Sequence, residues 1–256
     1  MHTTPLHLTE VVSRYTGVSE MASKSMPHFV RHLEADNGSL LLLAGNEVTY
    51  KLLATKETFT EVSAYKVRTV LSDGMAAWTL RHRQGGLASD TALDERWISM
   101  GDTSIASALV VPMMGRGAVI GLLSFHHATR GFFRESHLAR AAELAQLVAP
   151  HFDLALQTES SLASLVTLCQ SISHPSVVLD WHEQVQAINP AMQALDLIWD
   201  GGSFTQSLLP RELNADSVRA CTWEGPRALS TLPWLASVVP FRDVGLWIQL
   251  QPNPAR

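Results

Sequence analysis

The sequence predicts an α+β protein with two domains, each a central antiparallel β-sheet with flanking helices, joined by a long helix. Three observations point to this class. Short apolar runs occur in pairs around glycine-containing turns, as the strands of β-hairpins do. Apolar residues three and four positions apart recur over residues 6–35 and 135–172, which is the spacing of a helix face. All four lysines lie before residue 70, whereas five of the seven tryptophans lie after residue 180, so the two parts of the chain differ in kind.

Composition limits the classes of function. The 256 residues, 46% of them apolar, suffice for one large or two ordinary cores. Residues 1–150 carry no net charge and residues 151–256 carry −5, so no nucleic-acid partner is expected. No run of about 18 apolar residues occurs, so no membrane insertion is expected. Two cysteines, Cys169 and Cys221, and a first segment without signal-peptide features favour the cytoplasm.

The first elements are helices and a hairpin. Residues 6–35 are expected to form one or two helices, which end at Asp36-Asn37-Gly38. Residues 39–44 and 47–54 are strongly apolar and are joined by Gly45-Asn46, so they predict a β-hairpin.

A short helix and a second hairpin follow. The helix is expected over residues 75–80, with a capping side chain just before it and Gly85-Gly86 at its end, and a polar loop comes next. Residues 107–113 and 118–125 flank Gly115-Arg116-Gly117 and predict the second hairpin. Because both of its strands are apolar on much of both faces, we expect them to be central strands.

The segment 135–172 has an apolar seam with steps of three and four residues. Such a seam on a long helix suits pairing with a second copy of the chain, so a homodimer is expected. Pro150 should kink this helix or split it in two. The residues expected in the dimer seam are Leu138, Ala145, Val148, Phe152, Leu162 and Val166.

A second αβ unit is expected after His174-Pro175. Residues 177–179 and 185–188 predict two strands around a turn at Trp181-His182-Glu183. Asn189-Pro190 is a favourable helix start, because asparagine caps helices and proline is tolerated at the first helical position; the helix should run through Leu197. A loop at Gly201-Gly202 and three alternating strands complete the unit, over residues 219–224, 234–240 and 245–250.

Five segments of the first part together resemble a GAF domain. In order and spacing they are similar to the opening turn, the helix before the pocket, the loop that covers the pocket and the central hairpin of that family. These segments are Ala35–Leu40, Leu71–Trp78, Ser89–Trp97, Ser107–Pro112 and Val119–Ser124.

The second part resembles a short, divergent PAS domain. This resemblance rests on Pro175–Asp180, on Val185–Ala191 with its Asn189, and on the terminal strands. The chain is therefore expected to divide into an N-terminal helical segment (1–35), a GAF-like domain (36–150), a connecting helix (151–173) and a PAS-like domain (174–256).

The GAF resemblance implies a ligand pocket between the sheet and its helices. Aromatic walls with a few convergent polar groups would suit a small organic ligand. The same tryptophans could instead fill the core while the charged groups are solvated. The candidate ligand-binding residues are Trp78, Arg81, His82, Asp90, Asp94, Trp97 and His126.

The cofactor stays unidentified. A covalent bilin, as in phytochrome-like GAF domains, needs a thiol near the pocket, and residues 1–168 contain no cysteine. The same absence argues against the thiol chemistry of free methionine sulfoxide reductases, which resemble GAF domains. The Asn-Cys-Arg motif of flavin-cysteinyl sensors is absent. Of the pattern typical of cyclic-nucleotide-binding GAF domains, only Asp94-Glu95 is present.

The eleven histidines do not predict a metal or haem site. His28 and His32 share a helix face and His126 and His127 are neighbours, but neither pair has a carboxylate or thiolate partner at a metal-site spacing. His126 is the candidate for a haem ligand, and nothing else in the sequence supports haem. Cys169 and Cys221 are expected to be packing residues.

The function expected from the sequence is that of a non-catalytic sensory or regulatory protein. Ligand binding would shift the 135–172 helix and reposition the PAS-like domain. Because no output segment follows Leu250, the chain would dock onto a separate signalling protein or be part of a longer sensor. The alternatives are a structural adaptor that dimerises and docks partners without a ligand, and a non-covalent haem or chromophore sensor. An enzyme is not expected, since the sequence shows no nucleophile–base pair or metal cluster.

Overall fold

The computed structural model divides into two compact units, Met1–Leu156 and Gln157–Arg256, which are described one at a time. The described residues are 5–44, 47–55, 58–61, 71, 73–98, 104–180, 184–195, 227–228, 234–241 and 244–252.

The first unit is built on a six-stranded antiparallel sheet with the strand order β3-β2-β1-β6-β5-β4. Strands β1 and β6 lie at its centre, paired from Asn37 opposite His126 to Leu42 opposite Gly121. The strands are β1 (Asn37–Ala44), β2 (Glu47–Thr55), β3 (Phe59–Glu61), β4 (Gly86–Ala88), β5 (Ser107–Gly115) and β6 (Ala118–His127).

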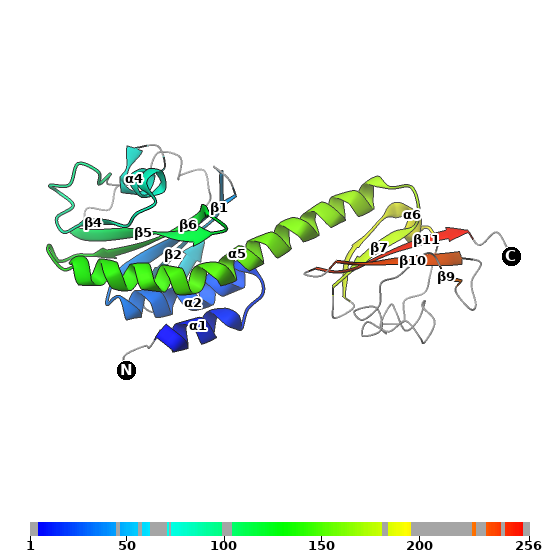
Figure 1. Ribbon diagram of the computed structural model, residues 1–256, viewed down its shortest axis with the longest axis horizontal. Coiled ribbons are helices and arrows are strands. Elements are labelled where there is room, and N and C mark those ends of the chain that lie inside the picture. Colours follow the sequence, from blue (N-terminus) through cyan, green and yellow to red (C-terminus); the bar gives the residue numbers. More distant parts are fainter. Residues whose placement is uncertain are drawn as a thin grey trace. The chain divides into compact units, whose positions relative to one another are not determined.

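Helices cover both faces of this sheet (Figure 1). One face packs against α2 and the first part of α5 in a large apolar core that includes Phe29, Phe125 and Phe152, and α1 adds Leu8 to it. On the other face, Met75 of α4 packs against strand residues in a smaller core. The helices are α1 (Pro5–Ser13), α2 (Val18–His32), α4 (Met75–His82) and α5 (Glu135–Ser171).

Most elements expected in this unit are confirmed, with four differences. Strands β3 and β4 were missed, because three residues are too few to show alternation. Helix α4 has Gly74 at its N-cap with no side-chain bond, and it ends at Arg83 in the left-handed region instead of at Gly85-Gly86. The central strands are β1 and β6, not β5 and β6. Helix α5 is continuous through Pro150, so the helix is not split in two there.

The expected dimer seam is corrected by the burial of its members. Ala145, Val148 and Phe152 are at most 1% exposed, because they lie in the core of their own unit. Leu138 packs against the same core. Leu162 and Val166 pack against the core of the second unit. Ala145, Val148 and Phe152 therefore face the core of their own unit and not a second copy, whereas Leu138, Leu162 and Val166 are only half-buried.

The second unit contains a five-stranded antiparallel sheet with the order β8-β7-β11-β10-β9. Leu165 and Cys169 of α5 pack against Val178, Ala187 and Val244. The expected strand at 219–224, the turn at 181–183, the loop at 201–202 and the end of the helix at Leu197 lie outside the described residues. The elements are β7 (Ser176–Leu179), β8 (Val185–Ile188), α6 (Pro190–Gln193), β9 (Arg227–Ala228), β10 (Trp234–Phe241) and β11 (Gly245–Pro252).

Asn189 is the hydrogen-bonding centre of this unit and is fully buried. Its Oδ1 accepts the backbone N–H of Met192 and of Ser176, each at 2.9 Å, so the predicted helix cap is confirmed. Its Nδ2 donates to the carbonyl oxygens of Ile172, at 3.0 Å, and His174, at 2.8 Å. One side chain thus joins the residues after α5 to β7 and α6.

Candidate functional site

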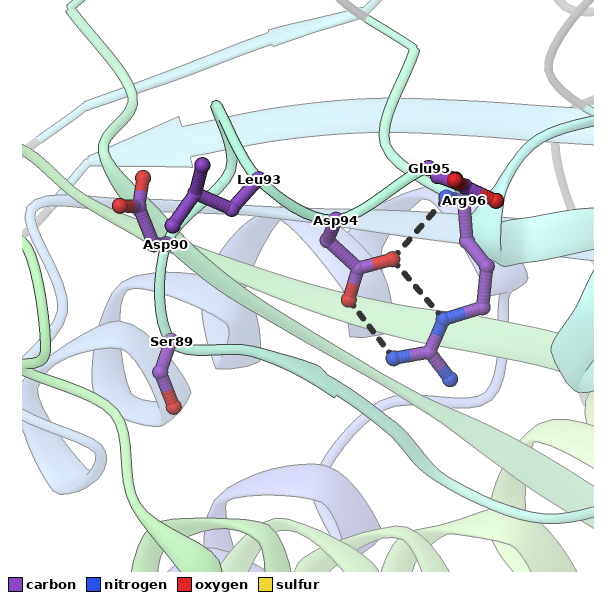
Figure 2. A pocket seen from close by; sticks show the side chains of 6 residues that line it. All are labelled: Ser89, Asp90, Leu93, Asp94, Glu95 and Arg96. Atoms are coloured by element: carbon purple, nitrogen blue, oxygen red, sulfur yellow. Dashed lines mark hydrogen bonds and ion pairs between the residues drawn. The ribbon is translucent and has the colours of Figure 1, made fainter.

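A hollow on the surface of the first unit is formed by the loop after β4. Its volume of about 510 Å³ is in the range of sites for small molecules, and it is shallow and widely open to solvent. Leu93 is 80% exposed, so the hollow presents an apolar group beside its charged ones. Six residues line the hollow, Ser89, Asp90, Leu93, Asp94, Glu95 and Arg96 (Figure 2).

Local hydrogen bonds shape this loop. The Asp90 carbonyl oxygen accepts the backbone N–H of Leu93 and of Asp94, both at 3.2 Å, which makes a tight turn. The Asp90 carboxylate accepts the N–H of Ala92 at 3.1 Å, a local bond that aspartate side chains favour in turns. Thr91 Oγ1 donates to the Ile105 carbonyl oxygen at 2.7 Å and fastens the loop to the chain just before β5.

Asp94 and Arg96 form the strongest pair in the hollow. The guanidinium donates to both carboxylate oxygens, from Nη2 at 2.7 Å and from Nε at 2.9 Å, and Nη2 also donates to the Leu87 carbonyl oxygen. These hydrogen bonds hold the pKa of Asp94 below its ordinary value, although burial acts in the opposite direction. The same bonds raise the pKa of Arg96. Both groups are therefore charged at neutral pH, and the guanidinium is fixed in place.

Aromatic rings of α4 lie next to Arg96, outside the lining of the hollow. The Arg96 guanidinium carbon lies 5.0 Å from the ring centroid of Trp78, within the range of a cation–π contact. The rings of Trp78 and His82 stack with centroids 4.6 Å apart. His82 Nδ1 donates to the Trp78 carbonyl oxygen at 2.9 Å, which fixes the orientation of the imidazole.

A second polar group adjoins the hollow at the end of β6. The ring of Trp97 meets the ring of His126 edge-on, with centroids 5.6 Å apart. His126 Nδ1 donates to Asn37 Oδ1 at 2.7 Å across the pair of central strands. The N–H of Trp97 donates to the Asp94 carbonyl oxygen at 2.9 Å, so the turn that carries Asp94 also carries Trp97.

The structure brings together only some of the predicted ligand-binding residues. Asp90 and Asp94 line the hollow. Trp78 and His82 stack beside Arg96, whereas Trp97 and His126 form the adjoining group. Arg81 is exposed on α4 and does not line the hollow.

Arg96 is the main residue that the sequence prediction missed. Its signal was present in the order Asp94-Glu95-Arg96, since an acidic and a basic residue two positions apart in a tight loop can pair. Ser89, Leu93 and Glu95 were also missed as lining residues.

In the described part of the chain, no three histidine, cysteine, aspartate or glutamate side chains lie close enough together to hold a metal ion. Burial raises the pKa of the Cys169 thiol, which lies in the core of the second unit. Cys221 is outside the described residues. None of the helices that the structure describes is both long and apolar enough to cross a membrane.

A comparison with protein families decides the identity of the first unit. The GAF domain family matches residues 19–151, which is more than half of the chain. The chain belongs to the GAF domain family. This match confirms the GAF resemblance and gives the chain the fold of a family with sensory and regulatory roles. The family match does not extend over the second unit.

Solved structures with a similar fold include several GAF domains. The GAF domain of an Acinetobacter phosphoenolpyruvate-protein phosphotransferase is 14% identical, covers 60% of this chain and 92% of its own, and has a TM-score of 0.46. A putative GAF sensor protein from Burkholderia vietnamiensis is 16% identical, covers 57% of this chain and 89% of its own, and has a TM-score of 0.47. No curated protein matches the chain.

One similar structure corrects the expectation that the chain is not an enzyme. The free methionine-R-sulfoxide reductase from Neisseria meningitidis is 16% identical, covers 60% of this chain and 88% of its own, and has a TM-score of 0.48. Such identity shows the fold alone. Because enzymes are among the proteins with this fold, the GAF fold of the chain is compatible with catalysis, and the exclusion was wrong.

Proposed function

We propose that the chain is a sensory or regulatory protein whose GAF domain binds a small organic molecule in the hollow after β4. The observation that carries this proposal is the fixed guanidinium of Arg96, held by the Asp94 carboxylate at 2.7 and 2.9 Å and placed against the ring of Trp78. A ligand would meet a cation already held in place, so it would not have to order a mobile arginine.

The chemistry of the hollow favours a ligand with both a polar and an apolar part. Arg96 can attract an electron-rich group, and the exposed Leu93 offers an apolar contact. Three carboxylates, those of Asp90, Asp94 and Glu95, line the hollow beside the one guanidinium, so the net negative charge disfavours an anionic ligand. A neutral small molecule with a carbonyl group and a hydrocarbon or aromatic part fits this combination.

The signal would pass along α5 to a PAS-like second domain. The sheet of the second unit supports the PAS-like assignment. In this sheet the first strand, β7, pairs with the last strand, β11, in the interior, which is the arrangement expected of a PAS-like fold. A ligand that binds one arrangement of the GAF domain better would increase the population of that arrangement.

We propose that a homodimer of the chain passes this change on by docking a separate signalling protein. Leu154 and Leu168 of α5 are 54% and 44% exposed and are candidates for such contacts.

A structural adaptor is the second candidate function. The observation that favours it is that both tryptophans of the region already have partners, Trp78 with His82 and Arg96, and Trp97 with His126. In an adaptor these contacts would stiffen a docking surface, and no small molecule would be needed.

Native mass spectrometry of the purified full chain separates the two functions. The sensor proposal predicts a dimer that retains a non-covalent mass of small-molecule size. A dimer without added mass would contradict the sensor and favour the adaptor. A monomer would contradict the proposed dimeric readout.

A further inference from the structure

The loop that precedes α5 contacts two residues that line the hollow, Ser89 and Asp90. The Gly131 N–H donates to the Ser89 carbonyl oxygen at 2.7 Å, and Ser89 Oγ donates to the Phe133 carbonyl oxygen at 3.3 Å. Arg130 Nε lies 3.1 Å from Asp90 Oδ2. Ser89 and Asp90 both line the hollow, so residues 128–134, here called the support loop, fix one of its walls.

The support loop leads into α5 through an unusual helix cap. The Arg134 carbonyl oxygen accepts the N–H of His137 at 2.9 Å and of Leu138 at 3.1 Å, which makes Arg134 the N-cap of α5. His137 is then the third residue of the helix. Its Nδ1 accepts the Arg134 N–H at 3.2 Å, the bond that a glutamate or glutamine makes at this position in a capping box.

Only neutral His137 can make this cap. A protonated imidazole carries a hydrogen on Nδ1 and has no acceptor. It would also place a positive charge at the helix N-terminus, where the helix dipole disfavours cations.

Most of the surroundings of His137 also favour its neutral form. Burial of the ring, and next the charge of Arg140, lower the pKa of His137; Glu34 opposes them and Arg134 adds to them. The Arg140 guanidinium is held by two groups: its Nη1 lies 3.7 Å from Glu34 Oε1, and its Nη2 donates to the His32 carbonyl oxygen. His32 is the last residue of α2 and Glu34 lies in the turn that follows it, so His137 faces groups from that part of the chain as well as from its own helix.

A stack of rings ties His137 to the support loop and to β6. Phe132 stacks on His127 with centroids 3.6 Å apart, and its ring lies 5.3 Å from that of His137. His127 Nδ1 accepts the Thr129 N–H at 2.9 Å, and its Nε2 lies 3.7 Å from Asp36 Oδ1.

We propose that His137 is a proton-sensitive latch: protonation breaks the cap of α5, loosens the support loop and thereby releases the wall of the hollow formed by Ser89 and Asp90. The latch adds control by pH to the GAF domain and does not depend on the identity of a ligand. The sign follows from the pKa of His137, which is lower in the folded chain than in the unfolded chain. Its stabilising contribution is complete above the ordinary histidine pKa and is lost as the pH falls through the lowered value.

Hydrogen exchange of the ligand-free full chain tests the latch. After correction for the intrinsic effect of pH, amides of residues 128–138 should exchange about fivefold faster at about pH 4.5, well below the ordinary histidine pKa, than at about pH 7.5, as expected for loss of one cap. In His137→Gln, which keeps an acceptor that does not titrate, the change should be below about twofold. His151→Gln, on the same helix, should behave as the wild type.

Two results would overturn the latch. One is a wild-type chain whose corrected exchange over residues 128–138 does not respond to pH. The other is a His137→Gln chain that responds as the wild type does. If His137→Gln fails to fold, nuclear magnetic resonance of the wild-type chain replaces it. The ring of His137 and the Arg134 amide should then titrate with one midpoint, and separate midpoints would refute the latch.

Discussion

Replacing Asn189 with alanine is expected to destabilise the second unit by about 4 kcal/mol. The variant leaves the buried N–H of Ser176 and the carbonyl oxygen of Ile172 without this partner. The N–H of Met192 and the carbonyl oxygen of His174 each lose one of two hydrogen bonds, because the Asn189 carbonyl oxygen and Ser176 Oγ still bond to them. Urea unfolding followed by tryptophan fluorescence measures the loss, because five of the seven tryptophans lie after residue 180 and report on this unit.

The control for Asn189→Ala is an exposed amide in the same sheet. Gln186 on β8 donates from Nε2 to Asp180 Oδ2 at 2.9 Å at the surface. Gln186→Ala should change the free energy of unfolding by less than about 0.5 kcal/mol. Equal effects of the two variants would show that Asn189 does not organise the unit.

Replacing Gly121 with alanine is expected to destabilise the GAF domain by about 3 kcal/mol. A Cβ at Gly121 would lie 2.5 Å from the carbonyl oxygen of Leu41 and 2.9 Å from Leu42 Cδ2. The first of these neighbours is backbone of the paired central strand and cannot move aside without breaking the β1–β6 ladder. Hydrogen exchange of peptides from β1 and β6 should show a corresponding loss of protection.

Gly117 is the matched control for Gly121, because it lies in the turn that leads into the same strand. It has a φ of +82° and nothing within 4 Å of an added Cβ. Gly117→Ala should therefore cost only the backbone strain of the left-handed region, about 1 kcal/mol. A smaller effect of Gly121→Ala than of Gly117→Ala would contradict the close approach of the central strands.

The elements of the fold that could be predicted are those with strong local signals. The turn 115–117 follows from its glycines, since Gly117 adopts a positive φ and Arg116 is strained into one. The start of α6 follows from Asn189-Pro190, because cap and first-turn preferences act within a few residues. Strands β3 and β4 depend on pairing with distant strands, so three residues carried no signal for them.

The prediction of a dimer seam was wrong at Ala145, Val148 and Phe152 for a related reason. A spacing of three and four identifies the apolar face of a helix and leaves open what covers that face. In α5, Val148 and Phe152 cover the sheet of their own domain.

The site could be predicted as a region and not as a set of contacts. The pocket loop was found because its motif and order are those of the GAF family. The pairing of Arg96 with Asp94, and the roles of Trp78 and Trp97, depend on how the loop turns back toward α4 and β6. Such tertiary contacts leave no periodic signal in the sequence.

The central claim, that the hollow binds a ligand through Arg96, is tested most directly by a thermal-shift comparison. The compound identified by native mass spectrometry is added to the full chain, to Arg96→Ala and to Arg81→Ala, which removes an exposed arginine of α4 outside the hollow. We expect the ligand to raise the melting temperature of the wild type and of Arg81→Ala equally, and to leave that of Arg96→Ala unchanged. An equal rise in all three chains would contradict the claim.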